Sequence, residues 1–192
     1  MIGGNTTSYY SVQRIGDSAW FMKYAPPKQQ PFLVQIDADG NPDSEKVIYD
    51  PEAADESGST SIEWYKVSPD AKLIAIALTV AGAEVADLHI FDLDSGERVD
   101  QIVPRVNGPT AGGDISWDSD SSGFYYTRYP RDGERSAEDQ NFHQQLWHRE
   151  LGTPLTDDSY EIGELFDRIA EIRVTQHHAS GKLLLTMQYG DS

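Results

Sequence analysis

The sequence predicts an all-β fold, a partial β-propeller of about three and a half four-stranded blades. Short β-branched and aromatic runs are separated by Gly, Pro, Asp and Ser clusters, and no stretch keeps a helical period beyond about ten residues. One pattern repeats four times: a strand that ends in an aromatic residue or Val, a tight polar turn, and a more apolar strand. The copies span 9–24, 62–78, 114–129 and 169–189. Their turns are 53, 50 and 58 residues apart, a period that fits a propeller blade.

The first three repeats continue with two further strands each. The third strands are expected at 31–36, 86–93 and 145–151, and the short fourth strands at 45–49, 97–103 and 159–162. The fourth repeat has only its first two strands. The repeats therefore cover about 9–50, 61–103, 114–162 and 168–192 of one propeller domain that spans 1–192.

The second strand of a propeller blade lies between neighbouring blades and is covered on both faces, so it should be a continuous apolar run. LIAIALTV (73–80) and LLLTM (183–187) both have this composition. A half-built fourth blade would leave a strand edge and an apolar face in water. We therefore expect the chain to be part of a longer polypeptide, or a subunit whose open ends need a partner. A self-sufficient β-sandwich is the alternative.

The composition excludes several classes of protein. The chain has 15 basic and 32 acidic residues, a net charge of −17, which argues against nucleic acid as a partner. It has no cysteine, which excludes disulfides and Cys-ligated metal sites. The longest uncharged apolar run, 73–83, is about half of the roughly 20 residues that a membrane-spanning helix needs. No secretory signal is visible, so we expect a cytoplasmic protein, or a periplasmic one if the native N-terminus is missing.

Motifs that carry chemistry are few. The serine-hydrolase elbow G-x-S-x-G has no match, and Ser59, Ser121 and Ser122 have the sequence context of hairpin turns. No Walker loop or G-x-G-x-x-G motif occurs. The run 118–123 resembles the start of a calcium loop, but Tyr129 stands where the bidentate Glu belongs, so a turn rich in Asp and Ser is favoured.

The five histidines are candidate metal ligands or acid–base groups. His177 and His178 are adjacent and would point to opposite faces of a strand. His143 and His148 are five residues apart and would also face opposite ways if they shared a strand. A structural role is favoured for each. The sequence thus predicts no catalytic, cofactor-binding or metal-binding residue, and no cofactor.

A longer signature lies in the third repeat. It joins the block ISWDSDSSGFYYTRYP (115–130) to the pattern N-x-H-Q-x-L-x-x-H-x-x-L-G-T. The residues of this pattern are Asn141, His143, Gln144, Leu146, His148, Leu151, Gly152 and Thr153, followed by Asp158 and Glu161. With weaker blocks at 67–97 and 168–185, this signature resembles the propeller of the prolyl oligopeptidase family of serine peptidases. The likeness covers nearly the whole chain.

The resemblance implies a seven-bladed propeller at the N-terminal side of an α/β-hydrolase domain, with this chain as roughly its first half. In the family the propeller caps the active site and restricts entry to short peptides. The catalytic serine, aspartate and histidine belong to the hydrolase domain, so the resemblance implies a proteolytic parent and an inactive chain. Ala71 replaces the usual turn glycine, 177–178 replaces an Asp-containing turn, and 108–114 lacks the family's apolar loop residues.

Two functions follow from the sequence. The first is a propeller segment of a prolyl-oligopeptidase-like serine-type endopeptidase that gates access of short peptides to a hydrolase domain absent from this chain. The alternative is a catalytically inactive propeller fragment that acts as an interaction or self-association module, with a second copy of the chain as its partner. A ligand- or cation-binding propeller unrelated to peptidases is a weaker option. Neither membrane nor nucleic acid is an expected partner.

Overall fold

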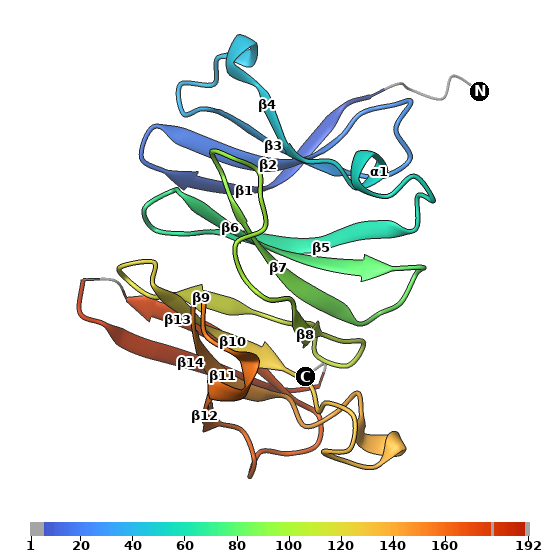
Figure 1. Ribbon diagram of the computed structural model, residues 1–192, viewed down its shortest axis with the longest axis vertical. Coiled ribbons are helices and arrows are strands. Elements are labelled where there is room, and N and C mark those ends of the chain that lie inside the picture. The colour runs from blue at the N-terminus through green and yellow to red at the C-terminus, as the bar shows by residue number, and fades with distance from the viewer. Residues whose placement is uncertain (1–5, 178, 191–192) are drawn as a thin grey trace.

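The computed structural model describes residues 6–177 and 179–190, which form a row of antiparallel β-sheets (Figure 1). There are three four-stranded sheets and one two-stranded sheet among them, and in each the strands pair in chain order. The first sheet contains β1 (Ser8–Ile15), β2 (Ser18–Tyr24), β3 (Phe32–Asp37) and β4 (Lys46–Tyr49). The second contains β5 (Thr60–Val67), β6 (Leu73–Val80), β7 (Ala86–Asp92) and β8 (Val103–Asn107). The third contains β9 (Ile115–Trp117), β10 (Gly123–Arg128), β11 (Gln145–Glu150) and β12 (Ser159–Ile162), and the fourth contains β13 (Ala170–His177) and β14 (Lys182–Tyr189).

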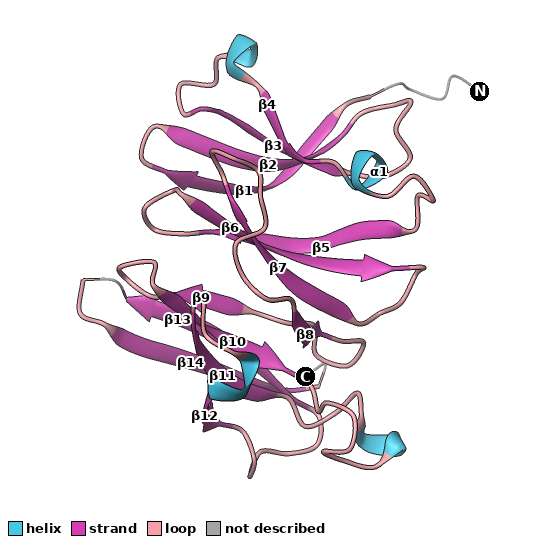
Figure 2. Cartoon of the chain, viewed as in Figure 1, coloured by secondary structure: helices cyan, strands magenta, loops and turns pink. Residues whose placement is uncertain are grey.

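Helices occupy only short connections between strands (Figure 2). They are η1 (Pro42–Ser44), α1 (Pro51–Ala54), η2 (Ala137–Asp139) and η3 (Leu155–Asp157). None of the helices in the described part of the chain has the length and apolar character needed to cross a membrane. The all-β class and the succession of propeller-like sheets that the repeats predict are therefore confirmed.

Strand β6 lies between two hydrophobic cores, as its continuous apolar sequence predicts. Ile74 and Ile76 pack with Trp20 and Leu33 of the first sheet. Residues of the opposite face, among them Ala75 and Ala77, pack with the aromatic side chains of the third sheet. Each large aliphatic side chain buried in this way stabilises the fold by about 1.5–3 kcal/mol. The expectation that this strand is covered on both faces is confirmed.

Strand β14 is not covered on both faces, as the composition of LLLTM alone predicts, but is exposed on one face, as expected for a half-built fourth blade. Leu184 is 66% exposed and Met187 is 42% exposed. The reason is that β14 pairs only with β13, and no described residues form a sheet that covers its outer face. An apolar strand face therefore lies in contact with solvent.

The fourth strand of the second repeat was predicted at 97–103, and this placement was wrong. In the structure β8 begins at Val103, and the earlier segment makes only an isolated bridge between Phe91 and Arg98. The pairing of β7 with β8 buries Val103 and Val106 against the core, whereas Val99 is 47% exposed. Burial of the later pair of valines selects the later segment as the strand.

Candidate functional site

The first strands of the sheets, β1, β5, β9 and β13, each lie at the edge of their own sheet and are joined to one another by side chains. Between the first two sheets, Gln13 Nε2 donates to the carbonyl of Tyr65 at 2.7 Å, and the amide of Val67 donates to Gln13 Oε1 at 3.0 Å. Side chains thus satisfy backbone groups at strand edges, which otherwise need another strand or water.

The third and fourth sheets are joined in the same way. The backbone amides of Val174 and Gln176 donate to Asp114 Oδ2 at 2.9 Å and to Ser116 Oγ at 2.8 Å. Two residues earlier along β13, the amide of Ile172 donates to Gln144 Oε1 at 2.7 Å. Alternate amides of one strand edge are therefore held by side chains of the neighbouring sheet, and the four first strands form one continuous wall.

A cavity of about 350 Å³ lies where these strands end. Its lining comes from all four sheets: Arg14, Ile15, Lys66, Val67, Pro69, Ile115, Ser116, Trp117, Val174, Thr175 and Gln176. The volume is at the lower end of the range of small-molecule sites. The indole of Trp117 is fixed by donation from Nε1 to the carbonyl of Lys66 at 3.1 Å. The cavity thus combines an ordered apolar wall with polar groups from several strands.

The charged side chains of this cavity are two cations, Arg14 and Lys66. Lys66 Nζ lies 2.8 Å from Asp114 Oδ1 and donates to the carbonyl of Ile115 at 3.1 Å, so its charge is largely balanced. The guanidinium of Arg14 is exposed and makes no hydrogen bond or ion pair with residues 6–177 or 179–190. An uncompensated guanidinium therefore faces a partly apolar cavity in a protein whose net charge is −17.

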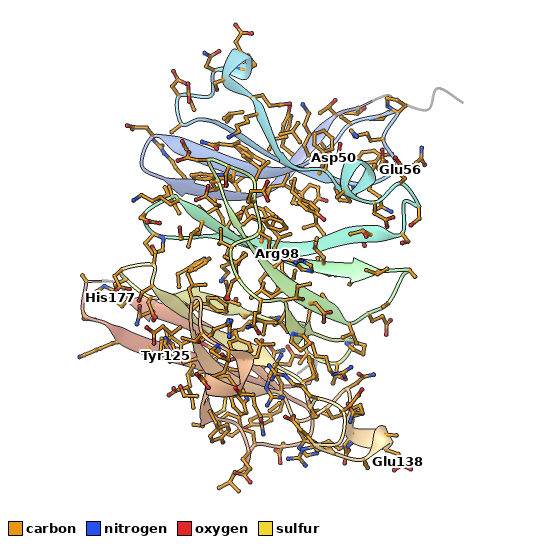
Figure 3. All side chains as sticks on the ribbon, viewed as in Figure 1. Asp50, Glu56, Arg98, Tyr125, Glu138 and His177 are labelled. Atoms are coloured by element: carbon orange, nitrogen blue, oxygen red, sulfur yellow. The ribbon has the colours of Figure 1, made fainter. Side chains whose placement is uncertain are left out.

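The opposite end of the wall is a network around the loop 108–114. Tyr129 Oη accepts a hydrogen bond of 2.7 Å from the amide of Ala111, and Gln144 Nε2 donates to the carbonyl of Gly112 at 3.1 Å. A side chain at Gly108 would lie 2.7 Å from the Tyr129 ring, so that position requires glycine. None of these residues lines the cavity, so the loop network and the cavity are separate features of the wall. Figure 3 labels His177, which follows the cavity-lining residue Gln176 on β13.

The serines considered from the sequence lie in turns. Ser59 Oγ donates to Asp55 Oδ2 at 2.8 Å, and Ser122 Oγ donates to Asp120 Oδ1 at 2.7 Å. Hydrogen bonds from hydroxyl groups of its own turn hold the pKa of Asp55 well below its usual value. Ser121 is buried, and its Oγ accepts from the amide of Asp70 at 3.4 Å. These hydroxyls stabilise turns and contacts between sheets.

The acidic turn at 118–123 does not assemble as a calcium loop. Asp118 Oδ2 lies 2.8 Å from Nε2 of His148, and the rings of His148 and Tyr125 are 4.6 Å apart. His143 precedes β11 and has a φ of 57°, so it does not share a strand with His148. The premise that these two histidines belong to one strand is therefore wrong. His177 bonds to Ser180, and His178 lies outside the described residues. Within the described ranges, no group of three or more His, Cys, Asp or Glu side chains has a metal-binding arrangement.

A buried ionic network was not found from the sequence. Arg149 Nε and a terminal nitrogen each lie 2.7 Å from an oxygen of Asp100, and Nη1 lies 2.7 Å from Asp158 Oδ1. Burial opposes the charge of Arg149, but these hydrogen bonds raise its pKa. Burial, and then a 2.7 Å hydrogen bond to Asp158, raise the pKa of Tyr126 as well. The network joins the second and third sheets through Arg149 on β11 and through the loops that precede β8 and β12.

Comparison with known sequences identifies the fold family. A sequence profile described as the N-terminal β-propeller domain of prolyl oligopeptidase matches residues 4–185. The chain belongs to the prolyl oligopeptidase family. Prolyl oligopeptidase A of Galerina marginata is 25% identical over 161 residues, which cover 76% of this chain and 21% of that protein. The prolyl endopeptidase of Elizabethkingia meningoseptica is 27% identical over 150 residues, which cover 77% and 20% respectively.

Solved structures agree with this assignment. A structure from a study of two prolyl endopeptidases and their inter-domain dynamics has a TM-score of 0.82 and 25% identity, and the match covers 97% of this chain and 27% of that one. Prolyl oligopeptidase B of Galerina marginata without ligand has a TM-score of 0.76 at 19% identity, which shows the same fold. The chain spans about a fifth of the curated relatives it matches. Within the prolyl oligopeptidase family, the wall of first strands and its cavity thus belong to the propeller domain.

Proposed function

We propose that the chain is the N-terminal propeller segment of a prolyl-oligopeptidase-like serine endopeptidase. In this role it gates the access of short peptides to a hydrolase domain that is not part of these 192 residues. The observation that carries the proposal is the continuous wall formed by β1, β5, β9 and β13. Cross-links such as Gln13 to Tyr65 and Asp114 to Val174 make this wall resistant to spreading. In the proposed function, further blades complete this wall to a ring, and the channel that it encloses admits a thin, extended peptide and excludes a folded protein.

The catalytic part of the proposal predicts that the isolated chain is inactive. The hydroxyls of Ser59 and Ser122 donate to carboxylates of their own turns, and neither is hydrogen-bonded to a histidine within the described residues. The purified chain incubated with a prolyl-peptide chromogenic substrate should release no chromophore. Turnover that a serine-directed reagent blocks would overturn the assignment of catalysis to a separate domain.

The gating part calls for a chimera. Residues 1–192 would replace the matching segment of the Elizabethkingia meningoseptica prolyl endopeptidase, and reaction with a serine-directed reagent would count the intact active sites. We expect the chimera to cleave a prolyl tetrapeptide and to spare the same sequence embedded in a folded protein. Equal cleavage of both by a chimera with intact active sites would contradict gating.

Self-association is a second candidate function, favoured by apolar surface at both ends of the row of sheets. On β14, Leu184 is 66% exposed, and on β1, Val12 is 60% exposed with Tyr9 at 50%. Apolar side chains that are exposed together on one face of a strand are typical of interaction surfaces. Light scattering tests this candidate: a dimer at micromolar concentration supports it, and a monomer with a cooperative melt contradicts it.

A further inference from the structure

We propose that the cavity at the ends of β1, β5, β9 and β13 binds the carboxylate of a peptide through Arg14. The inference rests on the proposed function and deepens it, because it names the chemical group that the peptide presents to the propeller wall. The ligand is a short peptide that carries either a free C-terminal carboxylate or an acidic side chain.

The charge of the lining supports an anionic ligand. Arg14 and Lys66 are the charged side chains that line the cavity, although acidic residues outnumber basic ones by 32 to 15 in the chain. Asp114 balances Lys66 at 2.8 Å, so the guanidinium of Arg14 supplies the unbalanced charge. A guanidinium presents parallel N–H donors that match the two oxygens of a carboxylate.

The walls of the cavity support a peptide as the carrier of that carboxylate. Ile15, Val67, Pro69 and Trp117 offer apolar contact beside Arg14, and proline or aliphatic residues of a peptide can pack there. Edge backbone groups of the wall are already engaged by side chains, as at Val174 and Gln176. A peptide therefore gains little from strand addition here and depends on its charged group for orientation.

Nearby carboxylates set a limit on the affinity. Asp17, Asp37 and Asp39 line a second depression that Arg14 also lines, but none lies within ion-pair distance of its guanidinium. Their negative charge weakens the attraction for a peptide carboxylate without occupying the donors. Neutralising one of them, as in Asp37→Asn, is expected to tighten carboxylate binding about twofold at low salt.

Calorimetric titration of the 192-residue chain with three peptides tests the proposal. The probes are acetyl-Ala-Gly-Pro-Ala with a free carboxylate, the same peptide as its C-terminal amide, and acetyl-Ala-Glu-Pro-Ala amide. We expect the free acid, the Glu peptide or both to bind at least tenfold more tightly than the neutral amide. Tighter binding of the free acid identifies the terminal carboxylate as the ligand, and tighter binding of the Glu peptide identifies the side-chain carboxylate. Binding of all three peptides within twofold of one another overturns the proposal.

Two variants assign the effect to Arg14. Arg14→Gln should abolish the preference for carboxylates, whereas Arg98→Gln, a matched loss of an exposed arginine outside the cavity (Figure 3), should keep it. Equal melting temperatures would show that both variants are folded. A preference that survives Arg14→Gln overturns the proposal. A failure of the gating function would be distinguishable from a failure of this proposal. In that case the chimera would cleave the prolyl site embedded in a folded protein, while the isolated chain would still bind the free-acid peptide more tightly than its amide.

Discussion

Arg149 and Asp100 form a two-point ion pair across the junction of the second and third sheets, with both side chains almost wholly buried. The two residues lie 49 positions apart. Asp158 accepts from the other side of the guanidinium and lies 4.0 Å from Arg131. Because these groups are removed from water together, the loss of Asp100 deprives two buried donors of Arg149 of their charged acceptor.

Asp100→Asn should therefore lower the free energy of unfolding by about 3 kcal/mol, since breaking a buried ion pair from one side costs more than the pair contributes. Chemical denaturation followed by tryptophan fluorescence measures the change. Asp94→Asn, at an exposed position six residues earlier, is the control and should change stability by less than about 0.5 kcal/mol. Equal effects of the two substitutions would show that the network is energetically neutral.

Ile76→Ala should destabilise the protein by about 3 kcal/mol. Ile76 is fully buried in the core between the first and second sheets, so truncation removes apolar contact and leaves a cavity. Val80→Ala on the same strand is the control, since Val80 is 56% exposed and its truncation should have little effect. Thermal melts of both variants decide the matter, and a loss below about 1 kcal/mol at Ile76 would contradict the two-core arrangement.

Ala81→Asn should stabilise the protein by about 1 kcal/mol. Ala81 and Gly82 both have positive φ, 57° and 69°, and the amide of Ala83 donates to the carbonyl of Val80 at 3.1 Å. A turn whose two central residues both have positive φ favours Asn-Gly, because Asn tolerates the left-handed conformation better than Ala. Ala83→Asn places the same side chain at an exposed position without positive φ and should not stabilise. A lower melting temperature for Ala81→Asn would contradict this turn geometry.

Acid should weaken the protein in part through Glu134. A hydrogen bond from Arg128 is the main cause that lowers the pKa of the Glu134 carboxyl from its ordinary 4.5. Because the pKa of Glu134 is lower in the folded state than in the unfolded state, its ionised carboxylate stabilises the fold fully at a pH above the unfolded-state pKa. This stabilisation is lost as the pH falls through the folded-state pKa. Stability measured from pH 7 to pH 3 should fall more steeply in the wild type than in Glu134→Gln. Parallel curves would contradict the role of this carboxylate.

The repeated strands could be predicted from the sequence because burial leaves a local pattern. Residues 73–78 are all apolar, and each belongs to one of the two cores, so composition alone indicates a doubly covered strand. The start of β8 was mistaken because Val99 and Val103 are both apolar, and only pairing with β7 decides between them. Local composition carries no information on which of two valines meets the core.

The ionic network and the cavity could not be predicted for a different reason. Arg149 and Asp100 belong to different repeats, and the cavity brings Arg14 beside Gln176 from the far end of the chain. No periodicity marks such pairs, because each of these charged or polar residues lies in a segment whose composition is typical of a solvated turn or a strand edge. A weak signal did exist for Asp158, which is part of the resemblance signature, but its charge partner could not be named.

The unequal faces of β6 make the sheets non-interchangeable. Ala75 and Ala77 leave space on one side that Trp117 and Phe124 of the third sheet fill, whereas Ile74 and Ile76 fill the other side themselves. Each sheet is thus shaped for one particular neighbour. In an array of identical copies of the second repeat, the Ala75 and Ala77 face of each copy would meet the Ile74 and Ile76 face of the next. Isoleucine side chains would then have to fill the space that Trp117 and Phe124 fill here, so such an array should pack less well than the native order of repeats.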